Sequence, residues 1–261
     1  MEYRIGCSGW SYPAWAGHFY PASLESKDYL KYYSGVFDTV EIDSSYYRIP
    51  NAFMTQKWAK ATPDNFRFTA KFPKTITHER RLAEPEKDLD YLYASFRPLR
   101  DKMAAFLIQL PPSLSKKEAF KKLELLAGQL DRGYRYAVEF RHDSWFEQDT
   151  YDLLASNNIC MAWSVLDSIK IPPKVTTDFI YLRFIGDRSI DEKDFGMIQR
   201  DRAKEMKSWA AKVKKTKEAP LAIVVQNNHY AGFGPGSANM FRRMVGLPEA
   251  TFEEMKQARL V

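Results

Sequence analysis

Acidic and basic side chains stand at the ends of several apolar segments of this sequence. Glu41 and Asp43 lie in TVEID, Lys71 ends FRFTAK, and Glu139 follows the apolar pair Ala137 and Val138. Carboxylates and an amine in such positions are groups that acid–base catalysis and anion binding require. Burying charges without partners costs several kcal/mol, so their repetition predicts a shared ligand site.

Glu139 is the first candidate for acid–base catalysis. Val138 and Phe140 flank it, and desolvation beside such neighbours is expected to raise the pKa of its carboxyl toward neutrality. Glu41 is the second candidate, three strands away. In a closed eight-stranded barrel we expect the two carboxyls to lie about 6 to 10 Å apart, with room for a small substrate or a water between them. Glycoside hydrolysis fits this arrangement loosely.

Lys71 is the third candidate catalytic residue. A buried lysine beside another cation can form a Schiff base, but a lysine at this position favours anion binding. Arg48 and Arg183 are expected to join it around a phosphate or carboxylate through bidentate hydrogen bonds.

The candidate ligand-binding residues share a position in a loop or near the end of an apolar segment. They are Ser8, Trp10, Tyr12, Asp43, Tyr46, Tyr47, Arg48, His78, Gln109, Arg141, Trp145, Asp167, Arg183, Asn227 and Asn228. The aromatic members offer faces for stacking on a sugar or a base, although about half of such loop aromatics are expected to plug core edges. An internal ion-pair network is the alternative for the charged members.

Metal and cofactor chemistry has little support in the sequence. Four histidines are scattered, and the two cysteines, Cys7 and Cys160, lack C-x-x-C spacing, which indicates buried free thiols. No residue pattern requires a cofactor, so we predict no metal site, with one Mg²⁺ or Mn²⁺ on Glu41, Asp43 or Glu139 as the alternative. Patterns typical of nucleotide-binding loops and of serine hydrolases are absent from the sequence.

Apolar runs and helical periodicity predict the elements that position these residues. Strands are expected at 3–9, 40–43, 66–72, 103–112, 135–145, 159–165, 179–186 and 221–228, with amphipathic helices at 30–37, 53–61, 86–99, 120–130, 150–157, 206–213 and 238–245. Eight strands that alternate with helices predict an α/β fold, a single (β/α)₈ TIM-type barrel spanning 1–261. Its parallel sheet would place the candidate residues at one mouth. An open doubly wound sheet is the alternative.

Composition is that of a globular protein. Among 261 residues, 45% are hydrophobic and 28% are charged, and no stretch has the length and purity of a membrane span, so we expect a cytoplasmic protein without membrane contact. The net charge of +6 permits a polyanionic partner. Lysines and arginines are spread through the chain, however, and the denser runs fall on predicted helix faces.

Seven segments together resemble the YecE-like family of domains of unknown function. They are GCSGWSYPAWAGHFYP, TVEIDSSYYRIP, WAKATPDNFRFTAKFPKTITH, FLIQLPPS, AVEFRHDSW, YLRFIG and VVQNNH, which occur in this order over nearly the whole chain. The resemblance implies a TIM-barrel-like fold. The family carries no established reaction, substrate or cofactor, and its likeness to sugar-isomerase and endonuclease-type barrels is an analogy.

The leading functional hypothesis is an enzyme that acts on a small anionic or nucleotide- or sugar-like ligand at the carboxyl-terminal mouth of the barrel. Carboxylates would move protons and Lys and Arg would contact the anion, in a hydrolase or isomerase type of reaction. A nucleic-acid-binding protein and a non-catalytic metabolite-binding protein are the alternatives. The sequence does not indicate an oligomeric state.

Overall fold

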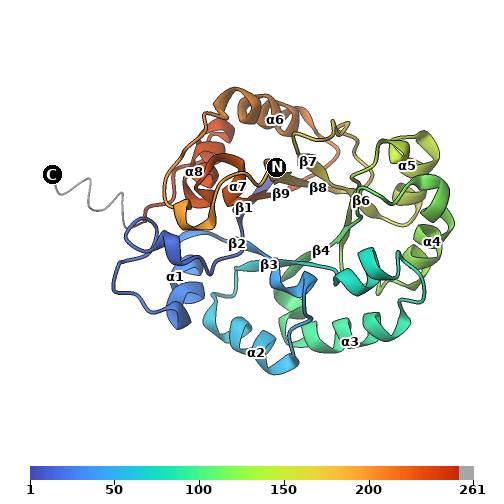
Figure 1. Ribbon diagram of the computed structural model, residues 1–261, viewed down its shortest axis with the longest axis horizontal. Helices are drawn as coiled ribbons and strands as arrows, with labels where there is room; N and C mark the ends of the chain where they lie inside the picture. Colours follow the sequence, from blue (N-terminus) through green and yellow to red (C-terminus); the bar gives the residue numbers. More distant parts are fainter. Residues whose placement is uncertain (253–261) are drawn as a thin grey trace.

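A ring of parallel strands forms the centre of the molecule, and helices surround it (Figure 1). The computed structural model describes residues 1–252. Within them the strands are β1 Glu2–Ser8, β2 Thr39–Ile42, β3 Arg67–Lys71, β4 Met103–Gln109, β5 Tyr136–Glu139, β6 Ile159–Met161, β7 Trp163–Val165, β8 Phe179–Phe184 and β9 Leu221–Gln226. The sheet order is β6-β5-β4-β3-β2-β1-β9-β8-β7, so each strand lies beside its neighbour in the chain.

The predicted sixth strand, 159–165, consists of two short strands. β6 pairs with β5 and β7 pairs with β8, and Ala162 alone separates them. The Ala162 N–H still donates to the carbonyl of Val138 on β5 at 2.9 Å. The chain therefore changes partner at Ala162 while continuing around the ring, which gives eight strand positions. The predicted α/β barrel is confirmed, with one of its strands interrupted.

The α-helices are α1 Tyr29–Val36, α2 Ala52–Ala61, α3 Glu86–Phe96, α4 Lys116–Gln129, α5 Gln148–Ser156, α6 Ala203–Lys215, α7 Asn228–Ala231 and α8 Gly234–Val245. Each amphipathic helix turns its apolar residues toward the strands. In α6, for example, the buried positions are Met206, Trp209, Ala210 and Val213, which recur at helical spacing. Among the described residues, no helix is long and apolar enough to cross a membrane.

The segment 229–237, which we expected to be a loop, is largely helical. The Asn227 side chain accepts a hydrogen bond from the His229 N–H at 3.0 Å and thereby caps α7. Gly232 ends α7 with a φ of 101°, and Pro235 lies in the first turn of α8. α7 is therefore stabilised by a side-chain cap, and the spacing of apolar residues does not predict so short a helix.

Alternation along the strands separates two environments. Val40 and Ile42 face the helices, within the larger hydrophobic cluster, whereas Glu41 between them faces the barrel interior. A smaller apolar cluster, which includes Leu107, Tyr181 and Val225, fills part of that interior. The charged strand-end residues follow it toward the carboxyl ends of the strands.

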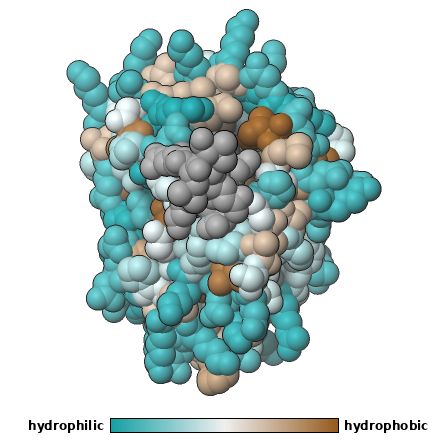
Figure 2. Space-filling view, turned by 90° about the vertical axis from the view of Figure 1, so that its left-hand side faces the viewer, coloured by the Kyte–Doolittle hydropathy of each residue, from teal (hydrophilic) through white to brown (hydrophobic). Residues whose placement is uncertain are grey.

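The surface in Figure 2 is mainly hydrophilic, with small, separate hydrophobic patches. The two cysteines, Cys7 and Cys160, are free and buried. Residues 253–261, which belong to the predicted domain 1–261, lie outside the described residues.

Candidate active site at the barrel mouth

Arg183 of β8 is the centre of the charged barrel interior. Its guanidinium binds Glu41 through two nitrogens, at 2.9 and 2.6 Å, and binds Glu139 through the third. All three side chains are buried. The guanidinium thus occupies the space between the two carboxylates, where we expected a substrate or a water.

Glu41 and Glu139 also accept hydrogen bonds from neutral hydroxyl groups. The Tyr181 hydroxyl lies 2.8 Å from Glu41, and the Ser164 hydroxyl donates to Glu139 at 2.8 Å. With these partners, both carboxylates are satisfied within the protein, as buried charges must be. Glu41, Glu139 and Arg183 therefore form an internal ion-pair network, which was the alternative interpretation of these charged residues.

The pKa expectation for Glu139 was wrong. Burial acts to raise the pKa of this carboxyl, but the charges of Arg183 and Arg141 outweigh it and hold the pKa well below its usual range. Arg141 donates to Glu139 at 2.7 Å, a contact that flanking-residue hydrophobicity could not reveal. Glu139 is therefore ionised at neutral pH and does not have the raised pKa of a general acid.

Asp43 and Lys71 form a second ion pair closer to solvent. The Lys71 Nζ lies 2.6 Å from Asp43 and 4.0 Å from Glu41. The Ser8 hydroxyl contacts both carboxylates, at 2.9 Å from Glu41 and closer to Asp43. Burial acts to raise the pKa of Asp43, but Lys71 and Arg183 lower it further than burial raises it. Ser8 thus connects the buried network to the outer ion pair.

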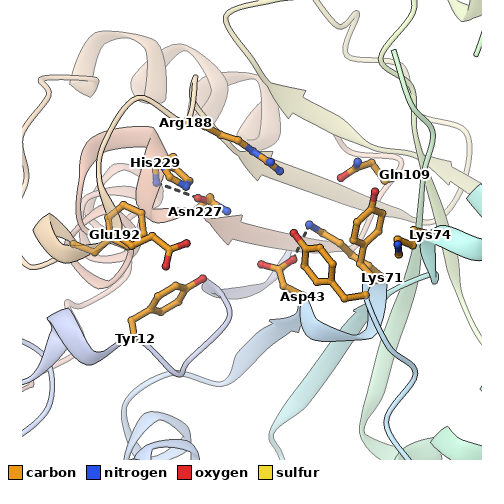
Figure 3. Close-up of a pocket in the computed structure, with 12 residues that line it drawn as sticks. Tyr12, Asp43, Lys71, Lys74, Gln109, Arg188, Glu192, Asn227 and His229 are labelled. Atoms are coloured by element: carbon orange, nitrogen blue, oxygen red, sulfur yellow. Dashed lines mark hydrogen bonds and ion pairs between the residues drawn. The ribbon is translucent and has the colours of Figure 1, made fainter. Parts of the chain in front are cut away.

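A cavity of about 450 Å³ opens above this pair (Figure 3). We call it the mouth cavity. Its lining residues are Tyr12, Asp43, Tyr46, Tyr47, Lys71, Lys74, Gln109, Arg188, Glu192, Phe195, Asn227 and His229. In the close-up, His229, Asn227, Glu192 and Tyr12 lie on one side, and Lys71, Lys74 and Gln109 lie on the other. Seven of the predicted site residues, Tyr12, Asp43, Tyr46, Tyr47, Lys71, Gln109 and Asn227, therefore meet at one cavity.

Arg188 extends into the mouth cavity from the loop after β8 (Figure 3). Its backbone has a φ of 62°, a left-handed conformation that is uncommon for a residue with a side chain. The cations Lys71 and Lys74 pair with Asp43 and Glu79. Within residues 1–252, by contrast, no hydrogen bond or ion pair joins Arg188 to another side chain. A guanidinium held in this way is available to a ligand.

His229 lies on the side of the mouth cavity opposite Lys71 and is the histidine of its lining. Burial and the charge of Arg188 lower the pKa of its imidazole below the ordinary value. Its ring packs edge-on against Phe195, with centroids 4.8 Å apart. The imidazole is consequently neutral at neutral pH and able to accept a proton.

Several predicted ligand-binding residues have structural contacts instead. Trp145 is fully buried, stacks on Phe140, and donates to the carbonyl of Leu114 at 2.8 Å, so it is a core residue. Asn228 is also buried, and its side-chain oxygen accepts from Trp15 at 3.1 Å. The structure places both side chains in the core, and a strand end in the sequence does not reveal which side chains turn back into the core.

Four more predicted residues lie outside the lining of the mouth cavity. Trp10 packs against Trp58 in a T-shaped contact, and Arg48 lines a separate groove with Met54. His78 packs against Tyr46, a wall residue of the mouth cavity. Asp167 pairs with Arg202 at 3.0 Å. None of these four predicted residues lines the mouth cavity.

Five cavity residues were missed as site candidates by sequence reasoning: Lys74, Arg188, Glu192, Phe195 and His229. Arg188, Glu192 and Phe195 come from the connection between the seventh and eighth predicted strands, which carries no periodic pattern. His229 follows Asn228 directly, and a shift of one residue past the predicted strand end would have found it. Among the described residues, no three His, Cys, Asp or Glu side chains group as metal ligands.

Fold and site together define a parallel α/β barrel with a charged cavity at the carboxyl ends of its strands. Residues 4–259 match the family described as protein of unknown function DUF72, and the chain belongs to this family.

Two curated relatives carry the names UPF0759. YunF of Bacillus subtilis (strain 168) is 33% identical over 178 residues, which are 64% of this chain and 61% of YunF. YecE of Escherichia coli (strain K12) is 30% identical over 145 residues, 54% of this chain and 49% of YecE. The matched part therefore spans less than two thirds of either relative. The resemblance to the YecE-like family is confirmed.

A crystal structure of a DUF72 family protein from Thermotoga maritima MSB8 is similar to the whole barrel. It has a TM-score of 0.81 and 28% identity, and the match covers 94% of this chain and 99% of that one.

Proposed function

We propose that this protein is an enzyme that binds a small anionic ligand, of sugar or nucleotide type, in the mouth cavity. The observation that carries the proposal is the Arg188 guanidinium, which points into the cavity without a protein partner among the described residues. An unpaired guanidinium beside two lysines is suited to a phosphate or carboxylate. Tyr12, Tyr46 and Phe195 supply ring faces for the rest of the ligand.

The division of charge in the cavity supports an anionic ligand. Asp43 and Glu192 are its carboxylates, whereas Lys71, Lys74 and Arg188 are its cations. Lys71 pairs with Asp43, and Lys74 pairs with Glu79 outside the lining, so Arg188 is the cation that remains for an anionic ligand. Lys71 is already oriented by Asp43 at 2.6 Å, so its remaining N–H groups are fixed in direction.

Acid–base chemistry would use the two sides of the cavity. On one side, His229 is neutral and accepts a proton; on the other, the Lys71–Asp43 pair stabilises the negative charge that develops on the ligand. Glu41 and Glu139, which do not line the cavity, act as positioning residues through Arg183 and Ser8. An isomerase or hydrolase type of reaction is compatible with this set.

Calorimetric titration tests the binding step. Inorganic phosphate, glucose 6-phosphate and AMP would be titrated into the wild type, Arg188→Ala, and the control Arg135→Ala, which changes an exposed ion pair with Asp178. We expect at least one probe to bind and Arg188→Ala to weaken it about tenfold or more, while the control binds like the wild type. The proposal fails if all three probes fail to bind, or if Arg188→Ala has no effect.

Turnover separates an enzyme from a metabolite-binding protein. Deuterium uptake and product formation would be followed by NMR for the probe that binds best. His229→Gln should lower the rate about 100-fold with little change in affinity, since one proton-transfer group is lost. Unchanged ligand in the presence of wild type, despite tight binding, would favour the non-catalytic alternative.

A further inference from the structure

A second cavity adjoins the mouth cavity. Its volume is about 430 Å³, and its lining residues are Arg141, Leu166, Asp167, Ser168, Ile185, Gly186, Asp187 and Arg188. We call it the side chamber. Arg188 lines both cavities, so this residue lies where they adjoin. A ligand bound at Arg188 therefore has two directions in which to extend.

The carboxylates of the side chamber are neutralised from outside it. Asp167 accepts two hydrogen bonds from Arg202, at 3.2 and 3.0 Å. Asp187 accepts one from Arg200 at 2.7 Å. Neither arginine lines the chamber, and each holds its aspartate in an ion pair. The hydrogen-bond donors that face a ligand in the chamber are therefore those of its own arginines.

Arg141 and Arg188 provide those donors, and Arg188 adds a positive charge that no carboxylate pairs with among residues 1–252. Arg141 donates from Nε to Glu139 and from Nη2 to Gln109, at 2.7 and 3.1 Å. A guanidinium has five N–H groups, so three of them remain on Arg141. Because Glu139 and Gln109 anchor the side chain, its free N–H groups have a fixed position. Arg188 adds a second guanidinium, which can make bidentate contacts.

We propose that the side chamber takes a second anionic group, and that the ligand is a small molecule with two such groups, of the sugar-bisphosphate kind. One group lies in the mouth cavity near Lys71, the other in the side chamber near Arg141, and Arg188 contacts both. This inference rests on the proposed function, because the first group is the anion already assigned to the mouth cavity. It adds the class of ligand and a binding role for Arg141.

The test compares glucose 6-phosphate with glucose 1,6-bisphosphate by calorimetry. Ser168→Asp places a carboxylate in the exposed lining of the side chamber, and Ser208→Asp makes the same change on the outer face of α6. We expect the wild type to bind the bisphosphate about tenfold or more tightly than the monophosphate. Ser168→Asp should abolish this preference and leave monophosphate binding nearly unchanged, while Ser208→Asp should preserve it.

The outcomes separate this inference from the proposed function. If the wild type binds the two sugars with equal affinity, and Arg188→Ala weakens both, the proposal that the side chamber binds a second anionic group is overturned. The mouth cavity then remains as the anion site. A bisphosphate preference that survives Ser168→Asp would overturn the side-chamber proposal as well. If neither sugar and no inorganic phosphate binds, the proposed function and the inference fail together.

Discussion

At the scale of single residues, Arg183 determines how the interior charges are arranged. Its guanidinium is shared by Glu41 and Glu139, and all three side chains are buried. Replacing it by methionine keeps much of the volume but removes the buried counter-charge that Glu41 and Glu139 share. We expect Arg183→Met to lower the free energy of unfolding by about 3 to 5 kcal/mol, measured by urea denaturation.

Arg135→Met is the matched control, because Arg135 forms an exposed ion pair with Asp178. Such a pair contributes at most about 1 kcal/mol. Equal effects of the two substitutions would contradict the assignment of Arg183 as the centre of the network.

The lowered pKa of Glu139 predicts how stability depends on pH. In the unfolded chain this carboxyl takes up a proton near pH 4.3, whereas in the folded chain, where Arg183 and Arg141 outweigh burial, it does so only at lower pH. Between these values the unfolded state binds more protons, so acid lowers the free energy of unfolding. The contribution is fully present above about pH 5 and is lost as the pH falls through the folded pKa.

We therefore expect the free energy of unfolding of Glu139→Gln to fall less steeply than that of the wild type below about pH 4.3, measured by urea denaturation from pH 3 to 7. Parallel curves for the two proteins would mean that the Glu139 carboxyl has the same pKa in the folded and unfolded chains.

What the sequence could predict at this scale was which charged residues lie on or at the end of a strand. It placed Glu41, Lys71 and Glu139 there, and all three side chains are buried in the structure. It could not predict which charges would pair, since pairing joins strands that are more than a hundred residues apart, as between Glu41 and Arg183. Arg188 was missed for the same reason: it stands in a loop whose course depends on the barrel beneath it.

At the scale of elements, the turn after β8 positions Arg188. Gly186 in this turn has a φ of 76°, and a Cβ built on it would lie 2.4 Å from the carbonyl oxygen of His229. We expect Gly186→Ala to lower the free energy of unfolding by more than about 1 kcal/mol, because neither the conformation nor the space suits a methyl group. The binding of phosphate probes should weaken as well, since Arg188 follows two residues later.

Gly35→Ala is the control for this substitution. Gly35 lies in α1, and an added Cβ would meet no atom within 4 Å. Alanine there should leave binding unchanged and raise the free energy of unfolding by up to about 1 kcal/mol. Urea denaturation and calorimetry measure both quantities. If Gly186→Ala binds the probes like wild type, the turn does not position Arg188.

The elements themselves were largely predictable, because apolar runs and helical spacing depend on local sequence. The break at Ala162 was not, because it arises where the ring closes and the chain changes from β5 to β8 as partner. The short helix α7 depends on the cap at Asn227. It was not predicted because its four residues contain no apolar repeat.

At the scale of the whole molecule, charge bears on the nucleic-acid-binding alternative. The chain has 39 lysines and arginines against 33 aspartates and glutamates, a net charge of +6. Many of these basic side chains are paired on the surface, as Arg81 is with Glu118 and Lys116 with Glu147. A positive net charge alone attracts nucleic acid weakly and without specificity at low salt.

Salt dependence separates this general attraction from the ligand in the mouth cavity. A complex with about six phosphate contacts loses roughly a thousandfold in affinity between 50 and 200 mM salt, because condensed counterions are no longer released as favourably. The cavity contacts are partly buried and are screened much less. We therefore expect oligonucleotide binding, followed by fluorescence anisotropy, to collapse over this range, while the affinity for the best phosphate probe changes only a few-fold. If an oligonucleotide stays bound to the wild type at 200 mM salt but does not bind Arg188→Ala, the mouth cavity binds nucleic acid. That result would contradict the small-ligand proposal.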